Sequence, residues 1–220
     1  MIHHLSFPEG SSINDNIPQD KCSVQYASIQ DAIELIKTVG RKSVCAKTDI
    51  SCAFRIINIK ELLYNLFGFM RERRYYYNKN LQMGCSSSCH IFENFSTALE
   101  WIDKNKILIP NIVHILDDFM IVDKTENGCK TILERFLAIC NDMGIPISKV
   151  KTFQPSQVMS FVGYEIDTRL MTVRLPIDKL AKCHNLIIVV LQKEKNTLSE
   201  LKGISEKTNR LNNWGKKILS

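Results

Sequence analysis

The chain has 220 residues, of which 45% are hydrophobic and 24% are charged, a balance typical of globular domains and too apolar for a disordered chain. Its apolar runs fall far short of the roughly 20 residues needed to cross a bilayer, and its first residues do not resemble a secretory signal. We therefore expect an intracellular protein, in the cytoplasm or nucleus, that is not secreted and has no membrane partner.

The net charge of +6 is unevenly distributed along the chain. Residues 1–173 hold 19 basic and 19 acidic side chains, whereas residues 174–220 hold 10 basic and 4 acidic ones. A basic segment on a neutral body fits a surface that follows a phosphate backbone. A solvated helix rich in lysine would give the same charge, so both interpretations stay open.

The cysteines do not form a disulfide pattern. All eight are scattered, and several fall at apolar positions of predicted helices or strands, which favours free thiols in a reducing compartment. Cys85, Cys89 and His90 lie close enough in sequence to suggest zinc, but no second pair lies at ligand spacing, and buried free cysteines are the favoured interpretation.

The first half of the chain predicts a loop, two helices and three strands. Residues 1–27 lack periodicity and are rich in turn formers. A helix begins after Ser28 and ends at Gly40, with apolar residues at helical spacing between them. We then expect a strand at 44–49, a short helix at 60–67, and strands at 67–70 and 75–78.

The second half predicts further helices and strands. Apolar residues recur at helical spacing over 88–104 and over 129–140. The expected strands are at 112–116, 119–122, 159–167 and 171–175. Two helices close the chain, one over 177–193 and one that begins at the capping box of residues 197–200.

The order of the central elements predicts the fold class. It reads strand, helix, strand, strand, helix, strand, which is the split βαβ order of a ferredoxin-like α+β fold with an antiparallel sheet. Such a sheet carries both helices on one face and leaves the other open. Because many functions share this layout, the fold alone does not identify one.

Asp117 and Asp118 are the best candidates for chemistry. They lie between two strand-like apolar segments, where a hairpin turn is the simplest interpretation. A two-residue hairpin turn prefers Asn-Gly or Asp-Gly, however, and adjacent carboxylates repel each other unless a cation lies between them. A metal-binding pair therefore explains the sequence better than a turn.

Asp49 is the candidate third carboxylate. It ends the strand predicted at 44–49, and if that strand lies beside the 112–122 hairpin, three carboxylates meet at one edge of the sheet. Such oxygen ligands suit Mg²⁺, and two ions could support an in-line phosphoryl displacement. Taken alone, Asp49 could equally be a helix cap.

Five short segments resemble motifs of reverse transcriptases, and they occur in that family's order across nearly the whole chain. They are Thr48-Asp49-Ile50-Ser51-Cys52-Ala53-Phe54, Leu81-Gln82-Met83-Gly84, Ile115-Leu116-Asp117-Asp118-Phe119, Gly144-Ile145-Pro146 with Lys151-Thr152, and Phe161-Val162-Gly163-Tyr164. Five motifs in order make a chance match implausible. The segments 2–10 and 83–89 look most like the retrotransposons that carry a tyrosine recombinase.

The resemblance implies roles for the catalytic residues. Asp49, Asp117 and Asp118 would hold two Mg²⁺ ions, or Mn²⁺, as metal ligands. Lys151 would lie near the leaving pyrophosphate, although it could be a plain surface lysine. Phe54 would lie under the nucleotide sugar and exclude a 2′-hydroxyl, although a core phenylalanine is what the residue alone suggests.

The resemblance also implies substrate-binding residues. Met83 and Gly84 would approach the template or the incoming base, with a methionine where many relatives have a glutamine. The same resemblance assigns the primer grip to Phe161, Val162 and Gly163, which would place the primer end. The implied partners are an RNA or DNA template-primer duplex and deoxynucleoside triphosphates.

The resemblance implies the palm of an RNA-directed DNA polymerase, the reverse transcriptase core of a retroelement. Residues 44–173 would be the palm, with a fingers segment inserted at about 60–80. Residues 1–43 would be a remnant of the fingers and residues 174–220 a basic helical thumb. Since the family's basic fingers residues have no counterpart here, we expect a truncated chain.

Two other functions remain as alternatives. One is a catalytically inactive, truncated reverse-transcriptase remnant that only binds nucleic acid. The other is a ferredoxin-like RNA-binding module, which Tyr75-Tyr76-Tyr77 beside Arg73 and Arg74 would fit. The strand pattern elsewhere does not follow that of an RNA-recognition sheet.

Overall fold

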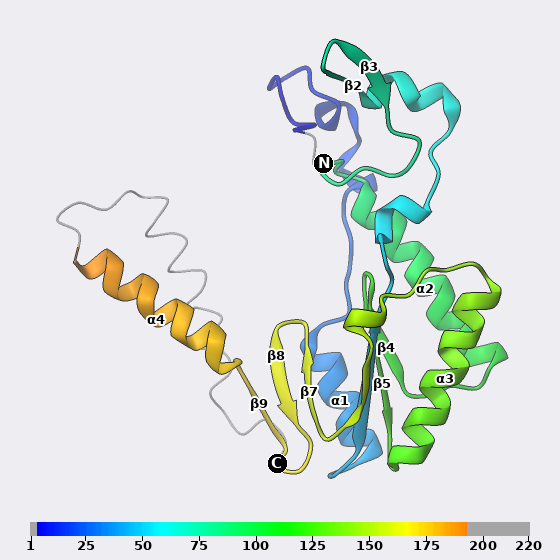
Figure 1. Ribbon diagram of the computed structural model, residues 1–220, viewed down its shortest axis with the longest axis vertical. Coiled ribbons are helices and arrows are strands. Elements are labelled where there is room, and N and C mark those ends of the chain that lie inside the picture. The colour runs from blue at the N-terminus through cyan, green and yellow to red at the C-terminus, as the bar shows by residue number, and fades with distance from the viewer. Residues whose placement is uncertain (1–3, 193–220) are drawn as a thin grey trace.

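The computed structural model describes residues 4–192 (Figure 1). Its longer helices are α1 (Ile29–Val39), α2 (Ser88–Lys106), α3 (Glu126–Asp142) and α4 (Ile177–Leu191). Shorter 3-10 helices include η3 (Ala53–Ile56), η4 (Glu61–Phe67) and η5 (Lys149–Lys151). The helix predicted to begin at residues 197–200 lies outside the described residues.

A four-stranded antiparallel sheet forms the centre of the molecule. Its strand order is β4 (Ile112–Ile115), β5 (Asp118–Asp123), β1 (Val44–Asp49) and β6 (Phe153–Ser156). Together with α2 and α3, these strands follow the predicted split βαβ order, which confirms the α+β fold class.

The two faces of this sheet are covered by different elements, as the alternation of side chains along a strand requires. Val44 and Ala46 of β1 belong to a buried cluster with side chains of α2 and α3, which lie together on one face. Cys45, on the opposite face, belongs to a second buried cluster with α1 and with strands β7 to β9. The expectation of an open second face was therefore wrong over much of the sheet.

A second sheet corrects the strand predicted at 159–167. It consists of β7 (Val158–Phe161), β8 (Tyr164–Asp167) and β9 (Thr172–Arg174), so that stretch is a hairpin rather than one strand. Val162 and Gly163 form its turn, both with positive φ, as a type I′ turn requires. The strand that completes the central sheet is instead β6, which was not predicted because Pro155 is unfavourable except at a sheet edge.

A separate hairpin of β2 (Gly68–Arg71) and β3 (Arg74–Tyr77) matches the predicted strand pair. The chain reaches it and returns from it along two paired segments. Ile59 N donates to Lys79 O over 2.9 Å, and Leu81 N donates to Ile57 O over 2.8 Å. These segments form a neck that joins the hairpin to η3 and α2, and the hairpin lies at the end of the molecule toward which β1 runs (Figure 1).

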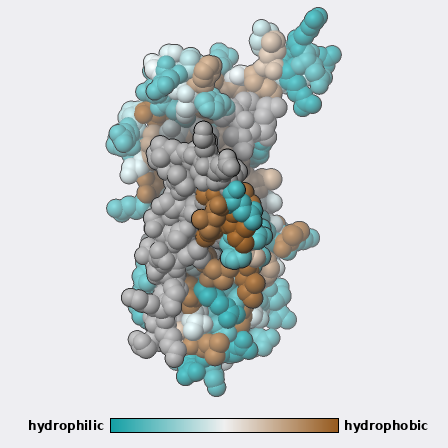
Figure 2. All heavy atoms as spheres, turned by 90° about the vertical axis from the view of Figure 1, so that its left-hand side faces the viewer, coloured by the Kyte–Doolittle hydropathy of each residue, from teal (hydrophilic) through white to brown (hydrophobic). Residues whose placement is uncertain are grey.

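Helix α4 projects from the second sheet (Figure 1). Several of its apolar side chains are exposed, including Ile177 at 80% and Leu191 at 78%. Figure 2 shows hydrophobic side chains on the surface of the face that carries this helix. No helix within residues 4–192 is long and apolar enough to span a membrane.

The cysteine predictions agree with the structure where it describes them. Every cysteine side chain that the structure describes is free. No group of three or more His, Cys, Asp or Glu side chains in the described part of the chain, which includes Cys85, Cys89 and His90, is arranged to hold an ion.

Candidate active site

The hairpin of β4 and β5 presents the paired aspartates. Ile115 pairs with Asp118, so the turn consists of Leu116 and Asp117, and Asp118 is already the first residue of β5. The prediction of a turn at Asp117-Asp118 was thus one residue out of register. Leu116 has a φ of +53°, which is unusual for a residue other than glycine. Strained residues of this kind cluster at functional sites.

Asp49 lies directly opposite Asp118 in the β1–β5 ladder. The surrounding backbone ties three segments of the chain together. Ile50 N donates to Asp117 O over 2.9 Å, and Ser148 N donates to Asp49 O over 2.9 Å. The expected convergence of Asp49 with the paired aspartates, and of the segment 144–152 with both, is therefore present in the fold.

Two lysines pair with the carboxylates. Lys151 Nζ lies 2.8 Å from Asp49 Oδ2, and Lys47 Nζ lies 2.8 Å from Asp118 Oδ2. The Lys47 side chain is only 15% exposed, so this pair is largely removed from solvent. Lys47 was not among the residues predicted from the sequence. The available signal was its i, i+2 spacing from Asp49, which places both side chains on one face of β1.

The electrostatics of the site are those of crowded carboxylates. Burial raises the pKa of Asp117, and the nearby Asp49 carboxylate raises it further, while Lys151 acts in the opposite direction. Burial likewise raises the pKa of Asp118, which Lys47 partly offsets. A cation placed among these groups would relieve both the repulsion and the loss of hydration.

The residues fit a divalent cation by their chemistry. Carboxylate oxygens are the ligands of Mg²⁺, and Asp118 Oδ1 is buried without a hydrogen-bond partner. The three carboxylates meet at one edge of the sheet, but within residues 4–192 no three His, Cys, Asp or Glu side chains are already arranged to hold an ion. Lys47 contacts an oxygen of Asp118, and Lys151 contacts an oxygen of Asp49. A cation would need these two oxygens as ligands.

A buried charged network supports the turn from the helix side. Glu93 of α2 is 6% exposed, and its Oε2 accepts a hydrogen bond from Leu116 N over 3.0 Å. Its Oε1 lies 3.3 Å from His114 Nε2, and the other ring nitrogen of His114 contacts Glu100. This network fixes the residue that precedes Asp117, and nothing in the sequence pattern had indicated it.

Phe54 lies in η3, a few residues beyond Asp49. Its ring contacts the fully buried ring of Phe92, with 5.3 Å between centroids and an interplanar angle of 59°. The side chain is half-buried. It therefore belongs partly to the core, and the part that remains accessible is what a sugar gate would use.

Met83 and Gly84 lie in the loop before α2. Met83 is 45% exposed, and Gly84 has a φ of +98° that disfavours any side chain. The N-terminal segment holds this loop in place, since Asn14 Nδ2 donates to Gly84 O over 2.8 Å and Asn14 Oδ1 accepts from Ser86 N over 2.9 Å.

The turn of residues 161–163 is only partly accessible. Phe161 is fully buried, and Lys47 Nζ lies 5.9 Å from the centroid of its ring. Val162 is 40% exposed, and Gly163 follows it in the turn. A primer could therefore contact Val162 and Gly163, whereas Phe161 would act by supporting them.

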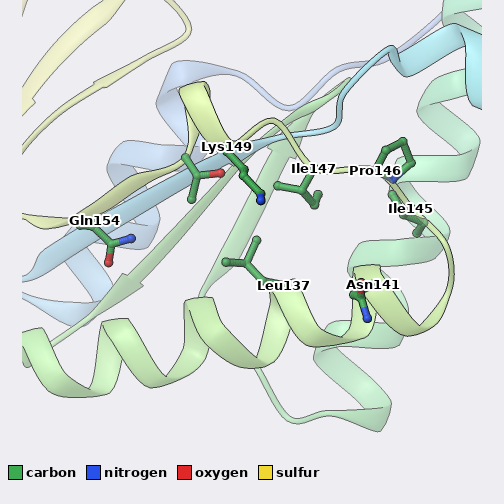
Figure 3. A pocket seen from close by; sticks show the side chains of 8 residues that line it. Leu137, Asn141, Ile145, Pro146, Ile147, Lys149 and Gln154 are labelled. Carbon is green, nitrogen blue, oxygen red and sulfur yellow. The ribbon is translucent and has the colours of Figure 1, made fainter.

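A hollow of about 450 Å³ lies between α3 and the segment 145–154. Figure 3 shows Leu137 and Asn141 of α3 facing Ile147, Lys149 and their neighbours across it. Its lining contains no carboxylate, so it is not the site of the aspartates.

Comparisons with known proteins agree with this geometry. Residues 4–166 match the family described as reverse transcriptase (RNA-dependent DNA polymerase). The chain therefore belongs to the reverse transcriptase family. A search of curated proteins finds no matching sequence.

Solved structures show the same fold. The foamy viral protease-reverse transcriptase in complex with double-stranded DNA is 22% identical, with a TM-score of 0.70. The foamy viral enzyme in complex with an RNA/DNA hybrid is 21% identical, with a TM-score of 0.71. Each match covers 90% of this chain but only 32% and 25%, respectively, of those longer chains.

Proposed function

We propose that this chain is the catalytic core of an RNA-directed DNA polymerase that adds deoxynucleotides to the 3′-hydroxyl of a primer. The observation that carries the proposal is the pairing of Asp49 with Asp118 across β1 and β5, with Asp117 beside them in the turn. The reverse transcriptase family places its catalytic carboxylates in the same two motifs.

In this proposal Asp49, Asp117 and Asp118 are the residues that would hold two Mg²⁺ ions, or Mn²⁺. Such ions, when bound, stabilise charge on the attacking and leaving oxygens of an in-line displacement. Asp118 Oδ1 is the oxygen available without any rearrangement. Asp49 now contacts the ammonium group of Lys151, and Asp118 that of Lys47. When a metal binds, these carboxylate oxygens would contact the metal instead.

Lys151 would act on the leaving group. Its side chain is 59% exposed, so it can leave Asp49 and reach a bound triphosphate. The hydrogen bond from Lys151 to Asp49 raises the pKa of Lys151, which keeps its ammonium group protonated before a triphosphate binds. A positive charge there would offset the negative charge that develops on pyrophosphate.

The remaining residues would position substrates. Phe54 would contact the sugar, Met83 and Gly84 the template or incoming base, and Val162 with Gly163 the primer end. We assign residues 44–173 to the palm, with the inserted fingers segment at about 60–80. Residues 1–43 and 174–220 would be a fingers remnant and a basic thumb, in a retroelement of the tyrosine-recombinase class.

Primer extension on an RNA template, with Mg²⁺ or Mn²⁺, tests the proposal. We expect extension by the purified chain and none by Asp117→Asn, while Asp142→Asn, which changes an exposed aspartate at the end of α3, retains activity. Melting of Asp117→Asn should equal or exceed that of the parent, because a buried charge with a raised pKa is removed.

A folded parent protein that extends no primer would reject the proposal in favour of the alternative, a remnant that binds nucleic acid without catalysis. Equal extension by the parent and by Asp117→Asn would remove Asp117 from the catalytic residues.

A further inference from the structure

The β2–β3 hairpin has no core of its own. All four residues of β3 are exposed, and Tyr75, Tyr76 and Tyr77 are 85%, 43% and 52% exposed. An aromatic side chain gains most of its stabilisation from burial, which Tyr75 lacks and which Tyr76 and Tyr77 obtain only in part, by stacking on Phe69 and on Tyr64. Their exposure therefore requires another explanation.

The two faces of the hairpin differ. Phe69 pairs with Tyr76 and Arg71 pairs with Arg74, and since directly paired residues point to the same side, these four side chains share one face. We call this set the aromatic-arginine face. The rings of Phe69 and Tyr76 are stacked, with centroids 5.6 Å apart and planes at 21°. A hollow of about 290 Å³ lies against this face, lined by Phe69, Arg71, Glu72 and Tyr76.

The charges on this face are unfavourable for the isolated hairpin. Arg71 and Arg74 lie directly opposite each other across the strands, and like charges in that position destabilise a sheet. Arg71 has one exposed contact with Glu72, at 3.4 Å, whereas Arg74 has no ion pair within residues 4–192. A bound anion would remove this repulsion.

The segment around the hairpin, residues 53–81, also carries a net positive charge. Residues 53–81 hold six basic and two acidic side chains, although residues 1–173 as a whole are neutral. Lys60 and Lys79, at the two sides of the neck, are exposed as well. Positive charge thus extends from the hairpin toward η3, which follows the strand that carries Asp49.

We propose that the aromatic-arginine face binds single-stranded nucleic acid, by stacking of bases on Phe69 and Tyr76 and by contact of phosphates with Arg71 and Arg74. Stacking platforms combined with basic side chains are the usual means by which proteins hold single strands without reading their sequence. Aromatic side chains and arginine also occur at protein interfaces, so a protein partner is the competing occupant that the experiment must exclude.

The position of the hairpin indicates which strand of nucleic acid it would bind. It lies beyond the end of β1 that carries Asp49 (Figure 1). If the chain is a polymerase, as proposed above, the single-stranded nucleic acid near this end is the template ahead of the primer terminus. That assignment rests on the proposed function, whereas binding of a single strand to this face does not.

Equilibrium binding without nucleotides or metal tests the inference. The probes are a fluorescent RNA strand of about 12 nucleotides, a blunt RNA/DNA duplex, and the same duplex with a single-stranded template extension of about 8 nucleotides. We expect Tyr76→Leu and the double variant Arg71→Gln with Arg74→Gln each to weaken binding of the single strand about tenfold. Both variants should also abolish the gain in affinity that the extension gives over the blunt duplex.

Two controls accompany these variants. Tyr75→Leu removes a more exposed ring from the opposite face of the same strand and should change affinity less than about twofold. Lys124→Gln with Lys130→Gln removes the same charge at the start of α3 and should leave the extension's gain intact. The double arginine variant relieves repulsion within the hairpin, so its loss of binding would not reflect unfolding.

Three results would overturn the inference. They are unchanged single-strand affinity in both hairpin variants, an equal loss for the blunt duplex, and self-association of the parent that Tyr76→Leu abolishes without any change in affinity for RNA. The last would assign the face to contact with a second copy of the chain. A chain that extends no primer but shows the expected losses would reject the proposed function and leave this inference standing.

Discussion

Glu93 of α2 holds the backbone of Leu116, whose N–H donates to Glu93 Oε2 over 3.0 Å. Leu116 is the first residue of the turn and has a positive φ, so its conformation depends on such outside support. Asp117 follows it directly. The geometry of Asp117, a proposed catalytic carboxylate, is therefore linked to a buried glutamate on a helix that contributes none of the proposed metal ligands.

Removing this support should destabilise the protein. Glu93→Ala leaves the buried N–H of Leu116 without its acceptor and removes the carboxylate that lies 3.3 Å from His114 Nε2, so we expect the free energy of unfolding to fall by about 1–3 kcal/mol. Glu93→Gln keeps an acceptor and should lose less. Urea unfolding measures both, with Glu134→Ala on the exposed side of α3 as control. Equal stability of Glu93→Ala and the control would show that the network is dispensable.

Asp103 predicts a pH dependence of stability. Its side chain is fully buried, neither oxygen has a hydrogen-bond partner, and burial together with the nearby Glu100 raises its pKa to about 7. Because the unfolded value is 3.8, the folded state binds more protons than the unfolded state between these two values. The free energy of unfolding therefore falls as the pH rises through this window.

Asp103→Asn should remove that dependence. We expect the variant to match the parent near pH 4 and to exceed its free energy of unfolding by roughly 4 kcal/mol near pH 8. Thermal unfolding at both pH values provides the measurement, and Asp142→Asn, on the surface, should show no such difference. If Asp103→Asn raised the free energy of unfolding by the same amount at both pH values, Asp103 would not titrate in this range.

Phe54 allows a test of substrate selection. If its accessible edge excludes the 2′-hydroxyl, Phe54→Val should raise ribonucleotide incorporation relative to deoxynucleotide incorporation by about tenfold. Loss of its contact with Phe92 should also lower stability, so Phe95→Val is the matched control, because Phe95 contacts the same ring at 5.7 Å. An unchanged ratio in single-nucleotide incorporation would leave Phe54 a core residue only.

The turn of the second sheet requires glycine at position 163. Gly163 has a φ of +84°, and an added methyl group would also meet the ammonium of Lys179. We expect Gly163→Ala to lower the free energy of unfolding by about 1–2 kcal/mol. Val162→Gly should have less effect, because Val162 already occupies a positive φ of +49° that glycine adopts without strain. A larger loss for Val162→Gly than for Gly163→Ala would contradict this account of the turn.

The sequence by itself determined the periodic elements and the type of site. Helical spacing predicted α1 and α3 because each buries one apolar stripe, and it predicted α2 although the buried face of that helix also carries Glu93, Ser96 and Asp103. The order of strands and helices predicted the ferredoxin-like α+β fold, and three carboxylates at strand ends predicted where the chemistry would lie. These features depend on residues near one another in the chain, so a local pattern is enough to reveal them.

Only the tertiary structure decided the rest. Lys47, Glu93 and His114 are indistinguishable in sequence from surface residues, and they contribute because folding removes them from water and places them against charges far along the chain. The identity of β6 likewise depended on pairing with β1, since a strand containing Pro155 is stable only at an edge. Burial and long-range pairing set the strength of an electrostatic contact, and neither is encoded by spacing along the sequence.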